Sequence, residues 1–465
     1  MLRRLGLAAA ACAVLAGGAM AQTVTITPDE ARAGLRQALA LRQYAVADQL
    51  AQAILRRLPD DFAAHAARAE VALQQGNGGQ ARDSARQASA LARSPGERFE
   101  ASILRARVAE QAGGALGPMT AMFWTRRAAQ QAPHVAYRSA AVGELRRLRA
   151  ESRLQLNLGI TLTPSSNVNN GTRETHVELP GWGGLAWVLS PQSRALSGWI
   201  AEGSVSGRYR LAETDVSARY LRFAVVQRKV RLSGESRQQL ADWRAAQIAA
   251  GNTPPADPNY DFAAVEAGVQ QMMLLGKAQV GLGATVGHNW FGGRDLSDYL
   301  RLDAQAERAL SPDLALFGTL LGERQWRDGG TGVDTLSVQA GVVQRLARGG
   351  KLRLALGARR TAAASVDTRH DALSARMGWE PAAPVAGLRL ETSVGVERRS
   401  YDASLLAPTG RSDLRLDAGV SVTFQALDYM GFAPTVDLRA SRYRSNVKLY
   451  DGRDLGISLG FRSVF

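Results

Sequence analysis

The sequence has 465 residues, of which 46% are hydrophobic and 21% charged, and its formal net charge is +15. This length allows two or three domains. A single cysteine excludes a disulfide framework, and beyond the N-terminus no apolar run reaches the roughly 18 residues that a transmembrane helix needs.

The first 21 residues have the pattern of a secretory signal peptide. Arg3 and Arg4 form a basic start, residues 5–16 an apolar core, and Ala19-Met20-Ala21 a small-residue cleavage site. The only cysteine, Cys12, lies in the apolar core, so cleavage leaves a mature chain without cysteine. Because an exported protein seldom meets nucleic acid, the basic charge favours anionic lipid headgroups, lipopolysaccharide or a polyanionic cargo as partners. Scattered surface arginine without a ligand is the alternative.

Residues 22–151 are predicted to form an all-helical periplasmic domain. Thr27 precedes a proline and two acidic residues, which is typical of a helix start, and Ala, Leu, Gln and Arg then follow at helical spacing. A repeat with a period near 34 residues resembles tetratricopeptide repeats, whose stacked helix pairs form a concave binding face. The residues that we predict for a cargo-binding helical face are Tyr44, Ala47, Ala51, Ala81 and Ala85. Helices that only cap or plug the following domain are the alternative.

Residues 152–465 are predicted to form a 14-stranded antiparallel transmembrane β-barrel, which makes the chain an α+β multidomain protein. After Arg153 the hydrophobic period changes to two, and the apolar face of each strand has no helix or second sheet to cover it. Apolar residues outside and charged residues inside describe a membrane barrel with a wet lumen. The predicted strands span 153–163, 196–211, 214–229, 259–274, 276–290, 296–310, 312–326, 333–347, 350–362, 368–381, 386–401, 410–426, 429–443 and 454–465.

The connections between these strands fall into two classes. Leu310–Asp313 and Arg348–Lys351 are predicted tight turns, whereas 164–195 and 230–258 are long loops, which we place on the side away from the helical domain. Weak alternation around Leu221–Phe223 and in residues 317–321 predicts bulges or misplaced strand boundaries in the third and seventh strands.

Both long loops contain a distinctive segment. A polar motif follows the first strand and consists of Pro164, Ser165, Ser166, Asn167, Asn169 and Asn170. Its side chains favour local hydrogen bonds to the backbone, either in an inward constriction or in a plain polar loop. The second loop is predicted to hold a short amphipathic helix with Leu240, Trp243 and Ile248 on one face. This helix could lid the pore, contact cargo or rest on the lipopolysaccharide surface.

The last strand resembles the terminal strand that the bacterial barrel-assembly machinery recognises. It carries apolar residues at alternate positions and ends on an aromatic residue, with Leu459, Phe461 and Phe465 as the predicted signal. Ser463 departs from that pattern, since an apolar residue is usual there.

No segment has the pattern of an enzyme or metal site. The histidines, at positions 65, 134, 176, 288 and 370, lack metal-ligand spacing, and the nucleophile-elbow, phosphate-loop and zinc-protease motifs do not occur. Lumen carboxylates interleave with arginines, which favours ion-paired wall residues over an acid/base pair. We therefore predict a protein without catalytic activity, metal or cofactor.

The order of these parts resembles the surface lipoprotein assembly modulators, the translocons of the type XI secretion system. The features that carry the resemblance are the signal peptide, the small helical domain, the asparagine motif after the first strand, and the fourteen-stranded barrel with a terminal phenylalanine. The resemblance implies delivery of surface lipoproteins, or of secreted haem- or metal-scavenging proteins, across the bacterial outer membrane. It also implies that the repeat domain engages cargo in the periplasm. A tetratricopeptide-barrel polysaccharide exporter and a passive porin are the alternatives, and the oligomeric state stays open.

Overall fold

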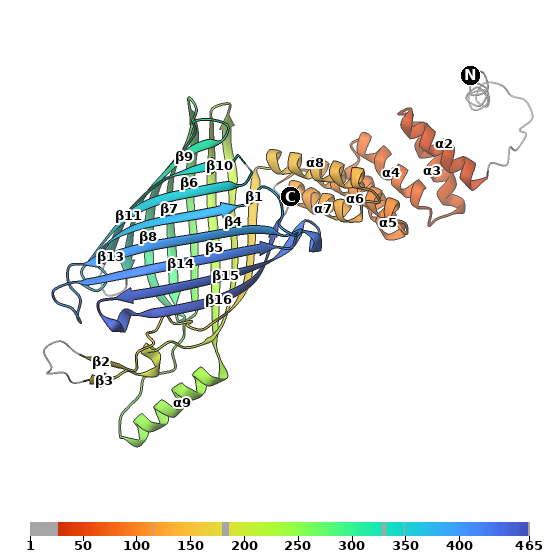
Figure 1. Cartoon of the computed structure of the whole chain (residues 1–465). Helices are drawn as coiled ribbons and strands as arrows, with labels where there is room; N and C mark the ends of the chain where they lie inside the picture. The colour runs from red at the N-terminus through yellow and green to blue at the C-terminus, as the bar shows by residue number, and fades with distance from the viewer. Residues whose placement is uncertain (1–26, 115, 179–185, 328–331, 348, 464–465) are drawn as a thin grey trace, which may run out of the picture. The chain divides into compact units, whose positions relative to one another are not determined.

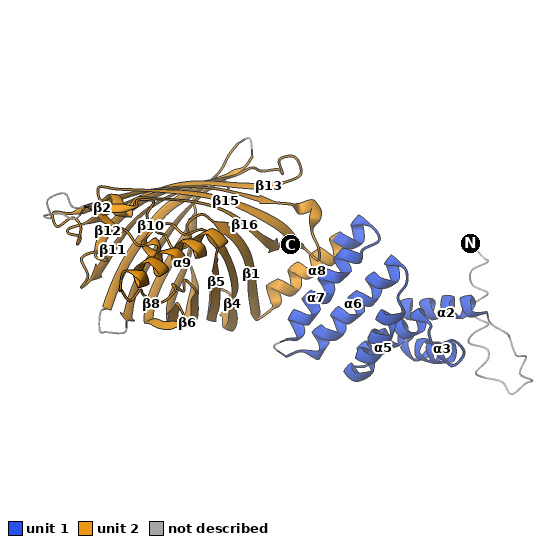
Figure 2. Ribbon diagram, turned by 90° about the horizontal axis from the view of Figure 1, so that it is seen from below, with its two compact units in different colours: residues 1–138 blue, residues 139–465 orange. Residues whose placement is uncertain are grey.

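A computed structural model describes residues 27–114, 116–178, 186–327, 332–347 and 349–463. The chain divides into two compact units, Met1–Arg138 and Ser139–Phe465, which are described separately below (Figures 1 and 2). The predicted signal peptide, Arg348 and the terminal Phe465 lie outside the described residues.

The amino-terminal part of the described chain is helical, as predicted. Its helices are α2 (Pro28–Ala40), α3 (Tyr44–Arg57), α4 (Phe62–Gln74), α5 (Gly78–Leu91), α6 (Pro95–Ala112), α7 (Gly117–Gln131) and α8 (Val135–Glu151). Thr27 caps α2 and Ser94 caps α6; each forms a capping box with the glutamate three residues later and precedes a proline. From α2 to α4 the start advances from residue 28 to residue 62, and from α3 to α5 from 44 to 78. The period near 34 residues is therefore present in the helices.

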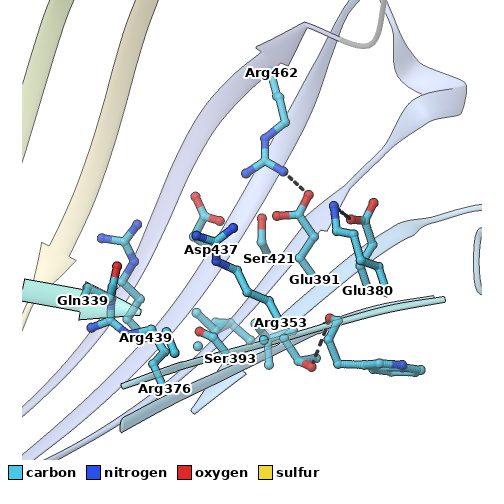
Figure 3. A pocket seen from close by; sticks show the side chains of 18 residues that line it. Gln339, Arg353, Arg376, Glu380, Glu391, Ser393, Ser421, Asp437, Arg439 and Arg462 are labelled. Carbon is cyan, nitrogen blue, oxygen red and sulfur yellow. Dashed lines mark hydrogen bonds and ion pairs between the residues drawn. The ribbon is translucent and has the colours of Figure 1, made fainter. Parts of the chain in front are cut away.

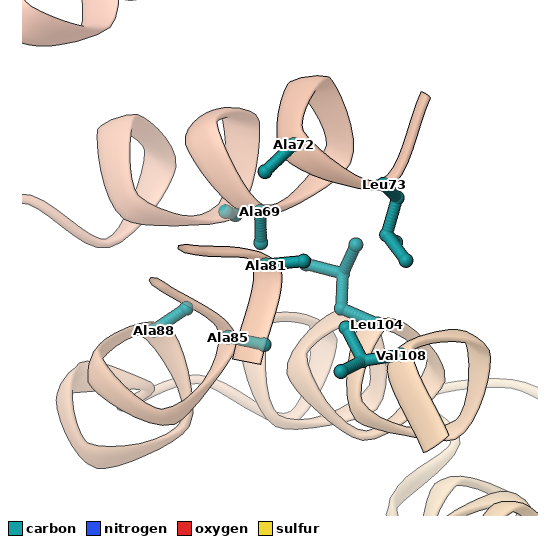
Figure 4. Close-up of a cluster of buried hydrophobic side chains, with 9 residues drawn as sticks. Ala69, Ala72, Leu73, Ala81, Ala85, Ala88, Leu104 and Val108 are labelled. Carbon is teal, nitrogen blue, oxygen red and sulfur yellow. The ribbon is translucent and has the colours of Figure 1, made fainter. Parts of the chain in front are cut away.

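Small side chains let these helices pack closely. One buried cluster joins alanines of α4 and α5 to Leu104 and Val108 of α6 (Figure 4). A second cluster joins α2, α3 and α4 around Leu35. The repeat alanines lie in these two cores: Ala47, Ala51 and Ala81 are 0% exposed, and Ala85 is 1% exposed. Our prediction that these four alanines form a cargo-binding face is therefore wrong, because neighbouring helices cover them; Tyr44 is half-buried.

The second unit contains a closed antiparallel barrel of fourteen strands, which confirms the predicted fold and strand number (Figure 1). Its strands are β1 (Leu154–Ser165), β4 (Gly198–Thr214), β5 (Ser217–Leu232), β6 (Phe262–Leu275), β7 (Ala278–Phe291), β8 (Arg294–Ala309), β9 (Leu314–Arg327), β10 (Gly332–Arg345), β11 (Lys351–Ala363), β12 (His370–Glu380), β13 (Arg389–Tyr401), β14 (Arg411–Thr423), β15 (Phe432–Ser445) and β16 (Gly452–Ser463). Each strand pairs with its sequence neighbour, and β16 closes the barrel against β1.

The register is continuous where we predicted bulges. β5 pairs with β6, and β9 with β10, without a shift around Leu221–Phe223 or in residues 317–321, so neither strand contains a bulge there. The alternative, a misplaced boundary, applies to both: β5 spans Ser217–Leu232 instead of 214–229, and β9 spans Leu314–Arg327 instead of 312–326. Shifts occur instead between Arg210 and Ala212 of β4, and opposite the Asn289–Trp290 step of β7. An extra residue in one strand of each pair produces them.

Apolar side chains cover the outer face of the barrel. Large hydrophobic residues at alternate positions stay exposed in the single chain, for example Leu282 at 48%, Leu336 at 56% and Leu356 at 69%. Aromatic residues flank this band: Trp199 and Trp326 lie near one rim, and Phe432 and Phe461 near the other. An apolar band between aromatic girdles is the outer surface of a transmembrane barrel. Among the described residues, no helix has the length and hydropathy required to cross a membrane.

The two rims differ in their connections. At the rim where β1 begins, which we call the turn end, short turns join the strands; Gly276 takes a positive φ of 59° there, which favours glycine. At the opposite rim, the loop end, residues 166–197 and 233–261 form the two long connections. They contain a two-stranded sheet of β2 (His176–Glu178) and β3 (Ala186–Val188), and helix α9 (Gly234–Ala249). Both long loops lie at one rim, as predicted, but the β7–β8 connection at that rim, Gly292–Gly293, is also a tight turn.

Candidate functional site

The carboxylates that alternation placed in the lumen are ion-paired with arginines. Arg399 lies 2.6 Å from Glu397, and Arg415 lies 2.8 Å from Asp417. The other two predicted carboxylates, Glu391 and Asp413, pair with Arg462 and Arg411 at 2.5 Å and 3.2 Å. Each of the four carboxylates thus has a guanidinium partner that balances its charge. The arrangement therefore favours a wall stabilised by charge pairs, and the absence of catalysis stays a prediction.

A polar pocket of about 550 Å³ lies on the inner wall near the turn end (Figure 3). Five basic and three acidic side chains line it: Lys351, Arg353, Arg376, Arg439 and Arg462, with Glu380, Glu391 and Asp437. Both glutamates pair with bases, Glu380 with Lys351 at 3.2 Å and Glu391 with Arg462. In the part of the chain that the structure describes, Arg376 and Arg439 have no ion pair. This side of the lumen is therefore positively charged and suited to anionic groups.

A buried arginine, Arg411, contacts residues of three inter-strand connections at the loop end. Arg411 is 5% exposed, and its guanidinium lies between the rings of Tyr401 and Tyr450, at 3.6 Å and 3.8 Å from their centroids. Its Nη1 lies 3.5 Å from a carboxylate oxygen of Asp367 in the connection between β11 and β12. Stacking on two rings together with ion pairs fixes this side chain firmly. Sequence reasoning missed it, because the four residues lie far apart in the chain and meet only at the rim of the folded sheet.

The asparagine motif ties the first long loop to itself. Asn169 donates from Nδ2 to the carbonyls of Gln192 and Arg194, at 3.0 Å and 2.7 Å, and its Oδ1 accepts from the Leu196 amide at 2.9 Å. Asn167 exchanges two hydrogen bonds of 2.8 Å with the backbone of Gly171. The motif therefore holds the start of the loop against its end, as the prediction of local backbone hydrogen bonding requires.

The remaining motif residues lie at and just after the carboxyl end of the first strand. Pro164 and Ser165 are the last residues of β1, two positions past the predicted strand end, because both pair with β4. Ser165 donates to Asp454 of β16 at 3.0 Å, and the Leu455 amide donates to Ser166 at 3.4 Å. Asn170 takes a left-handed φ of 52°, which asparagine tolerates better than most residues. The motif thus also links the loop to the closing strand.

Replacing Asn169 by alanine should loosen this loop. The substitution removes three hydrogen bonds and leaves backbone groups of residues 192–196 without partners, a loss of about 1–3 kcal/mol. We expect faster proteolytic cleavage within residues 166–197, measured on intact cells, with unchanged barrel assembly. The control is Asn170→Gly. Glycine keeps the left-handed backbone, so this change should affect neither the cleavage rate nor barrel assembly. Equal cleavage of all three proteins would contradict the structural role.

Helix α9 confirms the predicted helix in the second long loop but not a single apolar face. Leu240 is 4% exposed and packs with Val168 and Leu196 of the first loop. Ile248 is 63% exposed, so it does not share that contact, and Trp243 is half-buried. One apolar side chain of the predicted face thus anchors α9 to the asparagine loop, and Ile248 remains available at the surface.

The helical unit carries an aromatic and basic patch on α6 and α7. The Arg105 guanidinium lies 3.6 Å from the centroid of the Trp124 ring, and Arg127 lies 5.3 Å from the same ring. Phe123 packs edge-on against Trp124 and is 47% exposed. Burial, together with the nearby charges of Arg86 and Arg127, lowers the pKa of Arg105. Two arginines beside a half-buried tryptophan and an exposed phenylalanine suit an acidic or amphipathic segment, and sequence spacing gave no signal for this patch.

No metal-binding group emerges from the described residues, where His, Cys, Asp and Glu never gather in a suitable set of three. His288 lies against Asp298 and Asp295 at 2.7 Å and 3.2 Å, and His370 stacks on Tyr401. In the terminal strand, Leu459 and Phe461 point outward, at 52% and 66% exposure. Their role as a barrel-assembly signal stays a prediction.

Residues 355–465 match the family model described as surface lipoprotein assembly modifier, which confirms the resemblance over the segment from β11 to β16. No curated protein sequence matches the chain. The barrel and this family match together support an outer-membrane location.

Among solved structures, OccAB3 of Acinetobacter baumannii is 9% identical, with a TM-score of 0.36, over 66% of this chain and 98% of that one. A BenF-like porin from Pseudomonas fluorescens Pf-5 is 9% identical, with a TM-score of 0.33, over 67% and 98%. A bacterial polysaccharide outer membrane secretin is 6% identical, with a TM-score of 0.34, over 66% and 98%.

Proposed function

We propose, from the match of residues 355–465 to the surface lipoprotein assembly modifier family, that this protein is an outer-membrane translocon for surface lipoproteins or secreted haem- or metal-scavenging proteins. The family match is the observation that carries the proposal. In this proposal the turn end faces the periplasm and the helical unit, which precedes β1, is periplasmic. The signal peptide supplies export, and the barrel-assembly machinery inserts the barrel.

The surface patch of Arg105, Phe123, Trp124 and Arg127 is the proposed cargo contact of the helical unit. It replaces the repeat alanines, which are buried, and it offers a half-buried tryptophan beside two guanidiniums. Residues of these types dominate the binding energy of many protein interfaces. The lumen pocket, where Arg376 and Arg439 have no ion pair among the described residues, is a second positively charged surface for an acidic cargo segment.

Co-expression of this chain with lipoproteins encoded beside its gene tests the function. We expect at least one of them to become accessible to protease on intact cells only when the barrel is present. Trp124→Ala should lower that exposure about tenfold, since loss of an anchoring tryptophan costs on the order of 2 kcal/mol. Leu41→Ala, a change at a helix end that is 59% exposed, is the matched control and should have no effect. Unchanged exposure of every neighbouring lipoprotein with and without the barrel would refute the translocon.

The polysaccharide exporter remains the second candidate because of the positive lumen pocket. Arg376 and Arg439 could bind carboxylates or phosphates of a glycan as readily as those of a protein. Cell-surface glycan measured with and without the barrel separates the two, since the exporter predicts loss of glycan and unchanged lipoproteins. A passive porin would instead show high, cargo-independent conductance after reconstitution.

A further inference from the structure

The seam between β1 and β16 is paired over a shorter stretch than its neighbours. In β1, every residue from Leu154 to Ser165 has a partner in β4. Toward β16, the described pairs are only Thr161 with Gly460, Leu162 with Leu459, and Ser165 with Gly456. On its other side, β16 pairs with β15 without interruption from Gly452 to Ser463. The weak pairing therefore belongs to the place where the barrel closes.

Two separate causes interrupt this ladder. Within the paired stretch, Pro164 lacks an N–H group, so it cannot donate to β16. Toward the turn end, Gly159 and Ile160 have no ladder partner among the described residues of β16, although the register would set them opposite Arg462 and Phe461. Among the described residues, the strands are therefore paired near the loop end, between Thr161 and Ser165, and have no ladder pair at Gly159 and Ile160.

Side-chain hydrogen bonds strengthen the fastened part. Thr163 and Ser458 share a hydrogen bond of 2.7 Å across the seam, and Ser165 donates to Asp454 at 3.0 Å. These ties lie on the inner face, toward the loop end. We call Thr163, Ser165, Asp454 and Ser458 the polar clasp. Separation of β1 from β16 would therefore start at the turn end and stop at the polar clasp.

The two faces of the unpaired part differ in a way that suits a lipid-linked chain. Outward, Leu158, Ile160 and Phe461 are 67%, 71% and 66% exposed, so the membrane side is apolar. Inward, Gly159 presents no side chain, and the guanidinium of Arg462, which the register sets opposite it, is held by Glu391 of β13 at 2.5 Å. At Gly159 itself, no side chain therefore separates the lumen from the acyl region.

Unpaired backbone groups at membrane depth require a partner. Each N–H or C=O group left without one in the hydrocarbon costs several kcal/mol, and an extended peptide added to a strand edge satisfies them. A peptide in this place would have its backbone in the wall, and a lipid on its N-terminus would reach the bilayer directly. Such a peptide is the tether between the lipid anchor and the folded part of a lipoprotein.

We propose that the β1–β16 seam is a lateral binding site for the extended, acylated amino-terminal tether of a lipoprotein. The tether pairs with the free edge of β1 from the turn end, with its acyl chains outside the barrel. This inference rests on the translocon function proposed above. In this arrangement the lipid-anchored tether binds at the seam, and the polypeptide that follows it passes through the lumen.

A disulfide across the seam tests this site, because a mature chain without Cys12 contains no other cysteine. Leu162→Cys with Leu459→Cys joins the seam where it is paired. Val436→Cys with the same Leu459→Cys joins the uninterrupted β15–β16 pair and is the matched control. We expect oxidation of the first variant to lower surface exposure of the co-expressed lipoprotein at least tenfold, with recovery after reduction. The control should deliver cargo normally in both states, and heat-modifiable mobility on gels should show folded barrels throughout.

A photoreactive residue at Leu158 provides an independent reading. It should cross-link to the lipoprotein tether, whereas the same residue at Val394, an outward position in a fully paired strand, should not. Normal delivery by the oxidised seam variant, or equal loss in both disulfide variants, would overturn the lateral site and leave the translocon intact. A parent barrel that delivers no lipoprotein would refute the translocon and the seam site together.

Discussion

Replacing Leu356 by arginine should prevent most of the barrel from assembling. Leu356 lies in the middle of β11 on the outer face and is 69% exposed in the single chain. A charged side chain on the lipid face at the bilayer midplane costs about 2–4 kcal/mol in a transmembrane barrel. We expect a matching loss of unfolding free energy in denaturant titrations of the barrel in lipid vesicles, and less folded protein on semi-native gels.

Leu405→Arg is the control for this prediction. Leu405 lies in the connection between β13 and β14 at the loop end and is 78% exposed, so the added charge stays in water. The native Arg360 shows that β11 tolerates an outward arginine near its loop end, where it lies 3.5 Å from Asp371. Equal destabilisation by the Leu356 and Leu405 variants would contradict a membrane-facing band.

Replacing Leu35 by alanine should unfold the first helices without affecting the barrel. Leu35 is 1% exposed and packs in a cluster of α2, α3 and α4 that consists mainly of alanines, with Ile54 and Val71. A leucine deletion of this kind costs about 2–5 kcal/mol, because alanine neighbours cannot expand into the cavity. In the full-length protein in detergent, we expect the helical melting transition at 222 nm to fall by about 10 °C or more.

The barrel transition of the same sample serves as an internal reference. It should stay unchanged, because the two compact units have separate cores. Leu41→Ala, at an exposed helix end, should change the helical stability by less than about 0.5 kcal/mol. A helical transition that did not move for Leu35→Ala would contradict the packing of α2 against α3 and α4.

The helices and the strands follow from short-range patterns, so the sequence alone predicted them. Thr27 and the proline after it define the start of the first helix, and the capping box between Thr27 and Glu30 forms there. Period-two alternation identified fourteen strands because lipid on one side and water on the other act on every outward and inward position equally. Pairing of the lumen acids could also be foreseen, since arginines stand at alternate positions in the same strands.

Tertiary structure decided the features that depend on distant residues. The repeat alanines were predicted for a binding face, yet helix stacking buries them, and only three-dimensional packing brings Arg105 onto Trp124. Arg411 meets Tyr401 and Tyr450 because three connections converge at one rim. The short β1–β16 pairing depends on how the barrel closes between strands almost 300 residues apart, which no local pattern encodes. Local periodicity therefore determined the elements, and closure determined the seam and the surfaces.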